Sequence, residues 1–162
     1  MDVKNLRDLQ TREYWDARYE SEGATHVYDW FRDFDSLYST LRPLLPKPED
    51  SPRILELGCG NSTLTPGLHA KGFSGIVGLD FAPTLISQLQ ARHQGVQFLC
   101  LDILELERLA DDPSSGLGGA GSWDVVLDKG TLDALVAEKG DVWNPSDEVK
   151  ENAKREIDGA LR

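Results

Sequence analysis

The run ILELGCGNS, residues 54–62, joins a short apolar stretch to a turn that contains Gly58 and Gly60. Glycine lets the backbone turn sharply and lets a ligand lie directly against the main chain. In an open parallel sheet, ligands bind beyond the carboxyl ends of the strands, beside the first strand. Because a lone G-x-G also serves ordinary strand-to-helix turns, this run alone leaves a binding site and a plain turn equally open.

Similar short apolar runs recur further along the chain, and helical patterns separate them. The predicted strands cover residues 53–57, 76–79, 96–101 and 124–127. Predicted helices over residues 62–71 and 83–93 connect the first three strands. Nearly continuous apolar strands are typical of a parallel sheet that is buried on both faces. The alternation therefore predicts an α/β fold of three layers, built on a doubly wound Rossmann-like sheet with right-handed crossovers.

Further helical patterns flank this core. Polar helix formers predict a helix over residues 5–20, and apolar spacing predicts another over 34–45 that nearby prolines end. Residues 111–122 are rich in glycine and serine, so we expect a flexible surface segment with little that can pack. The last predicted helix, 146–162, carries an apolar residue at every fourth position: Val149, Ala153, Ile157 and Leu161.

Two carboxylates follow the predicted strands next to the glycine turn. Asp80 ends the second strand, and Asp102 comes directly after the third. An acidic side chain here can accept hydrogen bonds from ribose hydroxyls, and a helix N-cap aspartate is the alternative. A dinucleotide site needs a third glycine where this chain has Thr63, and a phosphate loop needs a lysine that is absent there. The residues therefore favour S-adenosylmethionine, which carries no phosphate, and NAD is the second choice.

Composition narrows the class of protein. A chain of 162 residues, 40% of them hydrophobic, is expected to form one domain with its own core. A net charge of −11 argues against nucleic acid or an anionic membrane as the main partner. The chain has only two cysteines and no apolar signal or membrane-spanning run, and its three histidines show no metal-ligand spacing. We therefore expect a cytoplasmic protein without a metal site.

Four separate blocks now point to a known family. They are YWDARY at 14–19, YDWF at 28–31, LGCGNS at 57–62 and DKGTLDAL at 128–135. With Asp80 and Asp102 between them, the chain resembles the class I (seven-β-strand) S-adenosylmethionine-dependent methyltransferases. More narrowly, it is similar to the eukaryotic methyltransferases that modify lysines of translation elongation factor 1-alpha, a subgroup that includes the methyltransferase region associated with endothelin-converting enzyme 2.

The resemblance implies roles for individual residues. Trp15, Tyr19 and Trp30 would line the cofactor pocket, and a packing role for the two tryptophans stays open. Flat aromatic rings also attract a sulfonium cation. The other implied cofactor contacts follow the strands: Gly58, Gly60, Asp80, Phe81, Asp102, Ile103 and Lys129.

The resemblance also implies a reaction, methylation of a protein lysine, with translation elongation factor 1-alpha as the partner. The attacking amine must be neutral, so a nearby proton acceptor or an apolar channel would help. Asp128 and Asp133 are candidates to orient this amine, and a structural role for each stays open. Two other functions also stay open: a small-molecule methyltransferase and a cofactor-binding module without catalysis.

Finally, the family pattern predicts more sheet than this chain provides. We expect residues 1–50 to form a helical cap over the cofactor site and residues 51–162 to form the core, within one domain overall. No strand is predicted after residues 124–127, so the fold is expected to be truncated there. An exposed sheet edge invites pairing with a second copy. We therefore expect retained cofactor binding, weak or no methyl transfer, and self-association through this edge.

Overall fold

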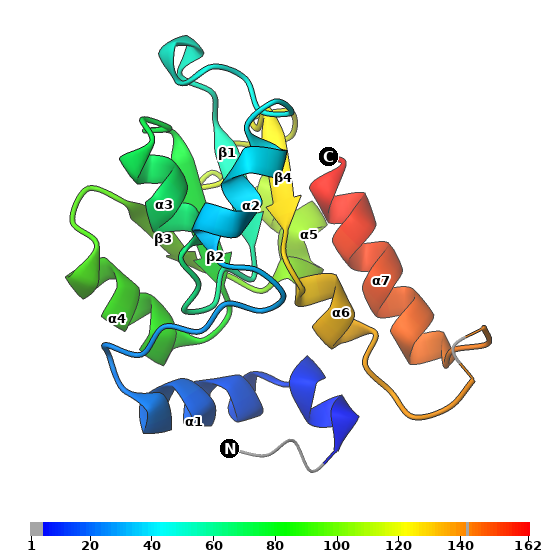
Figure 1. Cartoon of the computed structure of the whole chain (residues 1–162). Coiled ribbons are helices and arrows are strands. Elements are labelled where there is room, and N and C mark those ends of the chain that lie inside the picture. Colours follow the sequence, from blue (N-terminus) through cyan, green and yellow to red (C-terminus); the bar gives the residue numbers. More distant parts are fainter. Residues whose placement is uncertain (1–4, 142) are drawn as a thin grey trace.

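The computed structural model describes residues 5–141 and 143–162, and its centre is a four-stranded parallel sheet (Figure 1). The strand order is β3-β2-β1-β4. The strands are β1 (Ile54–Leu57), β2 (Ile76–Asp80), β3 (Gln97–Cys100) and β4 (Val125–Asp128). In this register Leu57 lies opposite Leu79 on one side and opposite Asp128 on the other. The predicted α/β fold with a doubly wound sheet is confirmed.

Helices cover both faces of the sheet and produce the three layers (Figure 1). One face carries α2 (Phe34–Leu41), α3 (Leu64–Ala70) and α4 (Pro83–Arg92). The opposite face carries α5 (Leu106–Ala110) and α7 (Asp147–Ala160). Helix α1 (Arg12–Glu22) packs beside α4, near the carboxyl ends of the strands (Figure 1). The short helix α6 (Thr131–Leu135) follows β4, and three 3-10 turns complete the set: Leu6–Gln10, Pro48–Asp50 and Ile103–Glu105.

The core alternates between the two faces of each central strand, as the pleat requires. Ile54 and Ile76 pack toward α3, whereas Leu55 and Val77 pack toward α5. Every residue of β1 and β2 is buried. The outer strands β3 and β4 are partly exposed, so burial on both faces was predicted correctly for the central pair only. An outer strand has a neighbour on one side and therefore loses part of its cover.

The N-terminal helix differs from the prediction of residues 5–20. The chain first forms a 3-10 turn, breaks at Thr11 and then begins α1, because the Thr11 hydroxyl caps the new helix by accepting from Tyr14 N at 3.4 Å. Helix α2 likewise ends at Leu41 and does not reach residue 45, because Pro43 has no backbone N–H with which to continue the helical hydrogen bonds. A capping hydroxyl and a proline therefore set these two helix boundaries, and the spacing of apolar residues does not show where such boundaries fall.

The glycine-rich segment 111–122, predicted to be a flexible surface segment with little that can pack, does contribute to the core. Leu117 is only 3% exposed and belongs to the core between the sheet and α5. The Arg53 guanidinium donates to the Leu117 carbonyl at 3.3 Å and stacks over the Trp123 ring at 4.2 Å. One leucine inside a polar segment is thus enough to fasten it to the core.

The predicted apolar stripe of α7 is also wrong in part. Val149 is buried, but Ile157 and Leu161 are 47% and 82% exposed. The buried position on the C-terminal half of the helix is Glu156, which is 3% exposed. Burial, followed by the neighbouring Asp128 carboxylate, raises the pKa of Glu156 well above its usual range. An acid pair therefore lies where the sequence pattern placed aliphatic side chains.

This burial makes a prediction about pH. Since the folded pKa of Glu156 is raised, the protonated form favours folding, and that contribution is complete at low pH and is lost as pH rises through the folded value. The parent should lose unfolding free energy between pH 6 and pH 9 as Glu156 ionises. Glu156→Gln cannot ionise, so its loss over the same interval should be smaller by about 1–3 kcal/mol. Urea unfolding at both pH values measures this. Glu151→Gln on the exposed face of α7 is the control, and parallel pH profiles for parent and Glu156→Gln would contradict the account.

Within the described residues, 5–141 and 143–162, no helix has the length and apolar character needed to cross a membrane.

Candidate functional site

The site is built on the turn that follows β1. Gly58 and Gly60 adopt φ values of +56° and +51°, a left-handed conformation that residues with a Cβ rarely adopt. Cys59 N donates to the Leu79 carbonyl at 2.8 Å, which continues the β1–β2 pairing into the turn. Thr131 of α6 packs directly against Gly58, and its hydroxyl donates to the Leu57 carbonyl at 2.9 Å. The end of β1 is thereby held against the start of α6.

The two carboxylates that follow β2 and β3 lie at the same edge of the sheet. Asp80 is buried and accepts from Gly60 N at 3.1 Å and from Ala82 N at 3.0 Å. Burial raises the pKa of Asp80 to about 6, and these backbone donors oppose that rise. Asp102 accepts from Leu104 N at 2.9 Å and so begins the turn at Ile103–Glu105. Both aspartates shape backbone turns, and the second lone pair of each oxygen is still available to a ligand.

Aromatic side chains from α1 and the following loop form one wall. Trp15 stacks on Tyr19 with ring centroids 5.8 Å apart and meets Trp30 edge-on at 6.1 Å. The Arg18 guanidinium lies over the Trp15 ring at 5.3 Å and pairs with Glu22 at 2.7 Å. Sequence reasoning missed Arg18, although it stands inside the YWDARY block. The Arg18 guanidinium lies over several of these rings, and the cation–π attraction helps to hold the aromatic cluster in place.

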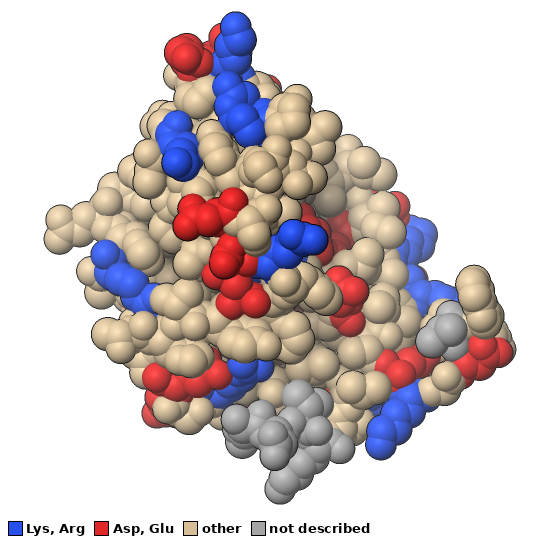
Figure 2. Space-filling view, in the orientation of Figure 1, with Lys and Arg blue, Asp and Glu red and all other residues tan. Residues whose placement is uncertain are grey.

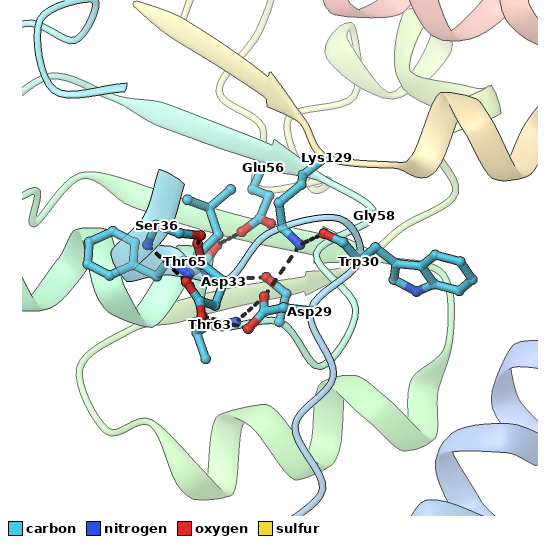
Figure 3. A network of polar contacts seen from close by, with 12 residues as sticks. Asp29, Trp30, Asp33, Ser36, Glu56, Gly58, Thr63, Thr65 and Lys129 are labelled. Carbon is cyan, nitrogen blue, oxygen red and sulfur yellow. Dashed lines mark hydrogen bonds and ion pairs between the residues drawn. The ribbon is translucent and has the colours of Figure 1, made fainter. Parts of the chain in front are cut away.

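A polar network connects this wall to the sheet (Figure 3). Lys129, directly after β4, lies between the Asp29 carboxylate and the Trp30 carbonyl, at 3.4 Å and 3.1 Å from its ammonium. Asp29 in turn accepts from Thr63 N at 3.1 Å and from the Thr63 hydroxyl at 2.8 Å. Asp29 and Thr63 were not among the predicted site residues. The sequence did offer a signal for both, because Asp29 lies inside the YDWF block and Thr63 directly follows the LGCGNS block.

Glu56 lies beneath this network, fully buried in β1. Its carboxylate accepts a short hydrogen bond from the Thr65 hydroxyl (Figure 3). Burial raises the pKa of Glu56 to about 7, and the Thr65 bond and the Lys129 charge both act in the opposite direction. Burial also raises the pKa of the Cys59 thiol, so this cysteine is a small turn residue and not an activated nucleophile.

These elements enclose a cavity at the carboxyl ends of the strands. All ten residues predicted to contact the cofactor line it: Trp15, Tyr19, Trp30, Gly58, Gly60, Asp80, Phe81, Asp102, Ile103 and Lys129. The cavity brings together residues from opposite ends of the chain, but the role of each in binding stays a prediction. Of the two candidates for orienting the acceptor, Asp133 lies on the lining. Asp128 accepts from Gly130 N and Leu132 N, each at 3.0 Å, and so caps α6.

The residues present fit an S-adenosyl ligand. Gly60 leaves the backbone of the turn bare, and a Cβ at this position would crowd the Tyr19 hydroxyl oxygen at 3.2 Å. Asp80 and Asp102 offer acceptors for a ribose and an adenine amino group, and the aromatic wall suits a cation. Acidic side chains also gather just below α2 on the face shown in Figure 2, with basic atoms beside them.

The Gly58 contact predicts a specific loss of stability. A Cβ at this position would lie 2.2 Å from the Thr131 hydroxyl oxygen, in addition to the strain of a positive φ. Gly58→Ala should therefore lower the free energy of unfolding by about 3–5 kcal/mol, whereas positive-φ strain alone costs about 1 kcal/mol. Gly121→Ala is the matched control, because Gly121 also has a positive φ but nothing within 4 Å. Equal losses in urea unfolding would show that the Thr131 contact adds no cost.

The family described as "Methyltransferase domain" matches residues 55–153 of the chain. EEF1A lysine methyltransferase 4 of Mus musculus is 43% identical over 145 residues, which cover 90% of this chain and 52% of that relative. The eEF1A lysine and N-terminal methyltransferase of Mus musculus is 29% identical, over 86% of this chain and 18% of its own length.

A solved structure also shares the fold. It comes from work on the conversion of a disulfide bond into a thioacetal group during echinomycin biosynthesis. Its TM-score is 0.51 at 24% identity, over 77% of this chain and 51% of that one. The chain spans about half the length of the EEF1A lysine methyltransferase 4 relatives that it matches. It belongs to the methyltransferase domain family, whose methyl donor is S-adenosylmethionine.

Proposed function

We propose that this chain carries the cofactor half of a protein-lysine N-methyltransferase that acts on translation elongation factor 1-alpha. The observation that carries the proposal is the single cavity in which the glycine turn, the strand-end aspartates and the aromatic wall meet. The substrate is supported by the names of relatives at 43% and 38% identity, which are lysine methyltransferases of that factor.

Within this proposal, S-adenosylmethionine supplies a methyl group on a sulfonium that already has a good leaving group. The chain's own residues bind and align it. Gly58 and Gly60 would receive the methionine part, Asp80 the ribose hydroxyls, and Asp102 the adenine amino group, with Phe81 and Ile103 as apolar walls. Trp15, Tyr19 and Trp30 would exclude water from the reacting centre, where alignment and desolvation supply most of the rate.

The acceptor side of the cavity is less enclosed. Asp133 is exposed on the lining and would orient the incoming amine, whereas Asp128 is already used as the cap of α6. Phe31, also on the lining, is 70% exposed. An open mouth suits a side chain presented by a protein better than a small molecule, which needs a closed acceptor pocket.

We also propose that residues 1–50 act as a cap and residues 51–162 as the core. Leu9, Gln10 and Trp15 contribute to the lining of the cavity from the N-terminal side, which supports this division. The protein would work in the cytoplasm, and its net charge of −11 supports a role without nucleic-acid or anionic-membrane partners.

Self-association through β4 is a further part of the proposal. In the described sheet, β4 pairs with β1 alone, so the backbone of Val125–Asp128 has one side without a strand neighbour. Sedimentation velocity over a concentration series would detect the dimer, and a constant monomer mass would contradict this part.

A transfer assay tests the function. Incubation with tritiated S-adenosylmethionine and purified elongation factor 1-alpha should label the factor on a lysine. Asp80→Ala should remove the label by weakening cofactor binding, and Asp35→Ala on the exposed start of α2 should not. Mass spectrometry of the labelled peptide identifies the residue.

The other outcomes of this assay identify the alternatives. Label recovered only in small molecules from a cell lysate would contradict the protein substrate and favour a small-molecule methyltransferase. Saturable cofactor binding with no label anywhere would favour a module that binds without catalysis.

A further inference from the structure

The segment between α1 and α2 contains a strained turn at the wall of the cavity. Arg32 N donates to the Trp30 carbonyl at 2.7 Å, which closes a three-residue turn around Phe31. Phe31 has φ +63°, a left-handed value that is uncommon for a residue with a Cβ. Strained backbone of this kind persists only where surrounding contacts impose it. The question is which contacts hold this turn.

Two bonds from one side chain reach the turn. The Lys129 ammonium donates to the Trp30 carbonyl at 3.1 Å and pairs with Asp29 Oδ1 at 3.4 Å. In Figure 3 the Trp30 indole extends away from this ion pair, so the pair holds the backbone of the wall and leaves the ring free to face the cavity. Lys129, at the end of β4, thus binds the backbone of the loop that carries Trp30.

Asp29 connects the same turn to the glycine loop. Its two oxygens accept from the backbone N and the hydroxyl of Thr63, at 3.1 Å and 2.8 Å. The Thr63 hydroxyl oxygen then accepts from Phe34 N at 3.0 Å, at the first residue of α2. The Asp29–Lys129 pair therefore joins three segments around the cavity: the aromatic loop, the turn after β1 and the end of β4.

The pair is poorly hydrated. The side chains of Lys129 and Asp29 are only 10% and 11% exposed. Glu56 is the other acidic group that faces Lys129, from within β1. Removing one partner of a buried pair leaves the other charge without compensation, which destabilises the arrangement around it.

We propose that Asp29 and Lys129 are positioning residues, whose ion pair fastens the Trp30–Phe31 turn so that Trp30 forms a wall of the cofactor cavity. This positioning role is separate from the cofactor contact that the resemblance implies for Lys129, and it does not require that contact. The proposal rests on the assignment of the cavity to S-adenosylmethionine, and it does not depend on which molecule accepts the methyl group.

A double-mutant cycle tests the proposal with S-adenosylhomocysteine as the probe. Asp29→Asn and Lys129→Met should each weaken its affinity about tenfold, and the double variant should be no weaker than the worse single one, because both remove the same pair. Lys129→Arg should restore most of the affinity. Lys154→Met, which breaks an exposed ion pair with Asp158 on α7, is the control and should change nothing.

A spectroscopic measurement separates positioning from general destabilisation. The emission of Trp30, taken as the difference between each protein and its Trp30→Phe version, should shift to longer wavelength in Asp29→Asn and Lys129→Met but not in Lys154→Met. Unchanged affinity in both single variants would overturn the proposal. Additive losses with an unshifted Trp30 spectrum would also overturn it and would indicate that Lys129 contacts the cofactor directly.

The experiments distinguish failure of this positioning role from failure of the proposed function. A parent chain that binds no S-adenosylhomocysteine would refute the assignment of the cavity, and the Trp30 spectra would still decide whether the pair holds the turn. Tight binding without transfer to elongation factor 1-alpha would refute the substrate and leave the positioning role intact.

Discussion

The contact between Gly58 and Thr131 constrains the rest of the site. The chain must reverse direction directly after β1, and it does so with a positive φ at Gly58 and no room for a Cβ beside the Thr131 side chain. That contact fixes where α6 begins relative to β1. The same turn contains Gly60, whose backbone N–H donates to Asp80. A cavity bounded by β1, β2 and α6 depends on this one close approach.

The carboxylates then act on two levels at once. Asp80 holds the glycine turn and the start of α4, and it lines the cavity. Desolvation raises its pKa to about 6, so a ligand that donates hydrogen bonds would stabilise the ionised form. Asp102 likewise has two roles, because it starts a 3-10 turn and also lines the cavity. Residues that shape the backbone here are therefore also those suited to recognise a nucleoside.

Most of the core fold could be predicted from the sequence, because short apolar strands between glycine turns have few alternatives. The errors occur where tertiary contacts decide. Residues 111–122 look like a flexible surface segment, yet Leu117 belongs to the core. In α7, Glu156 is buried beside Asp128, a neighbour that no helical period predicts. The cavity lining followed from the family blocks, but the Asp29–Lys129 pair did not, since its partners are far apart in the chain and meet only after the sheet has formed. A pattern of neighbouring residues cannot predict a pair of this kind.

The central claim is that the cavity at the carboxyl ends of the strands holds S-adenosylmethionine. Titration calorimetry of the purified chain with S-adenosylmethionine tests it most directly. The account predicts saturable binding with one ligand per chain and no heat of binding for NAD. Binding of NAD with equal or higher affinity, or no binding of S-adenosylmethionine by a folded chain, would contradict it.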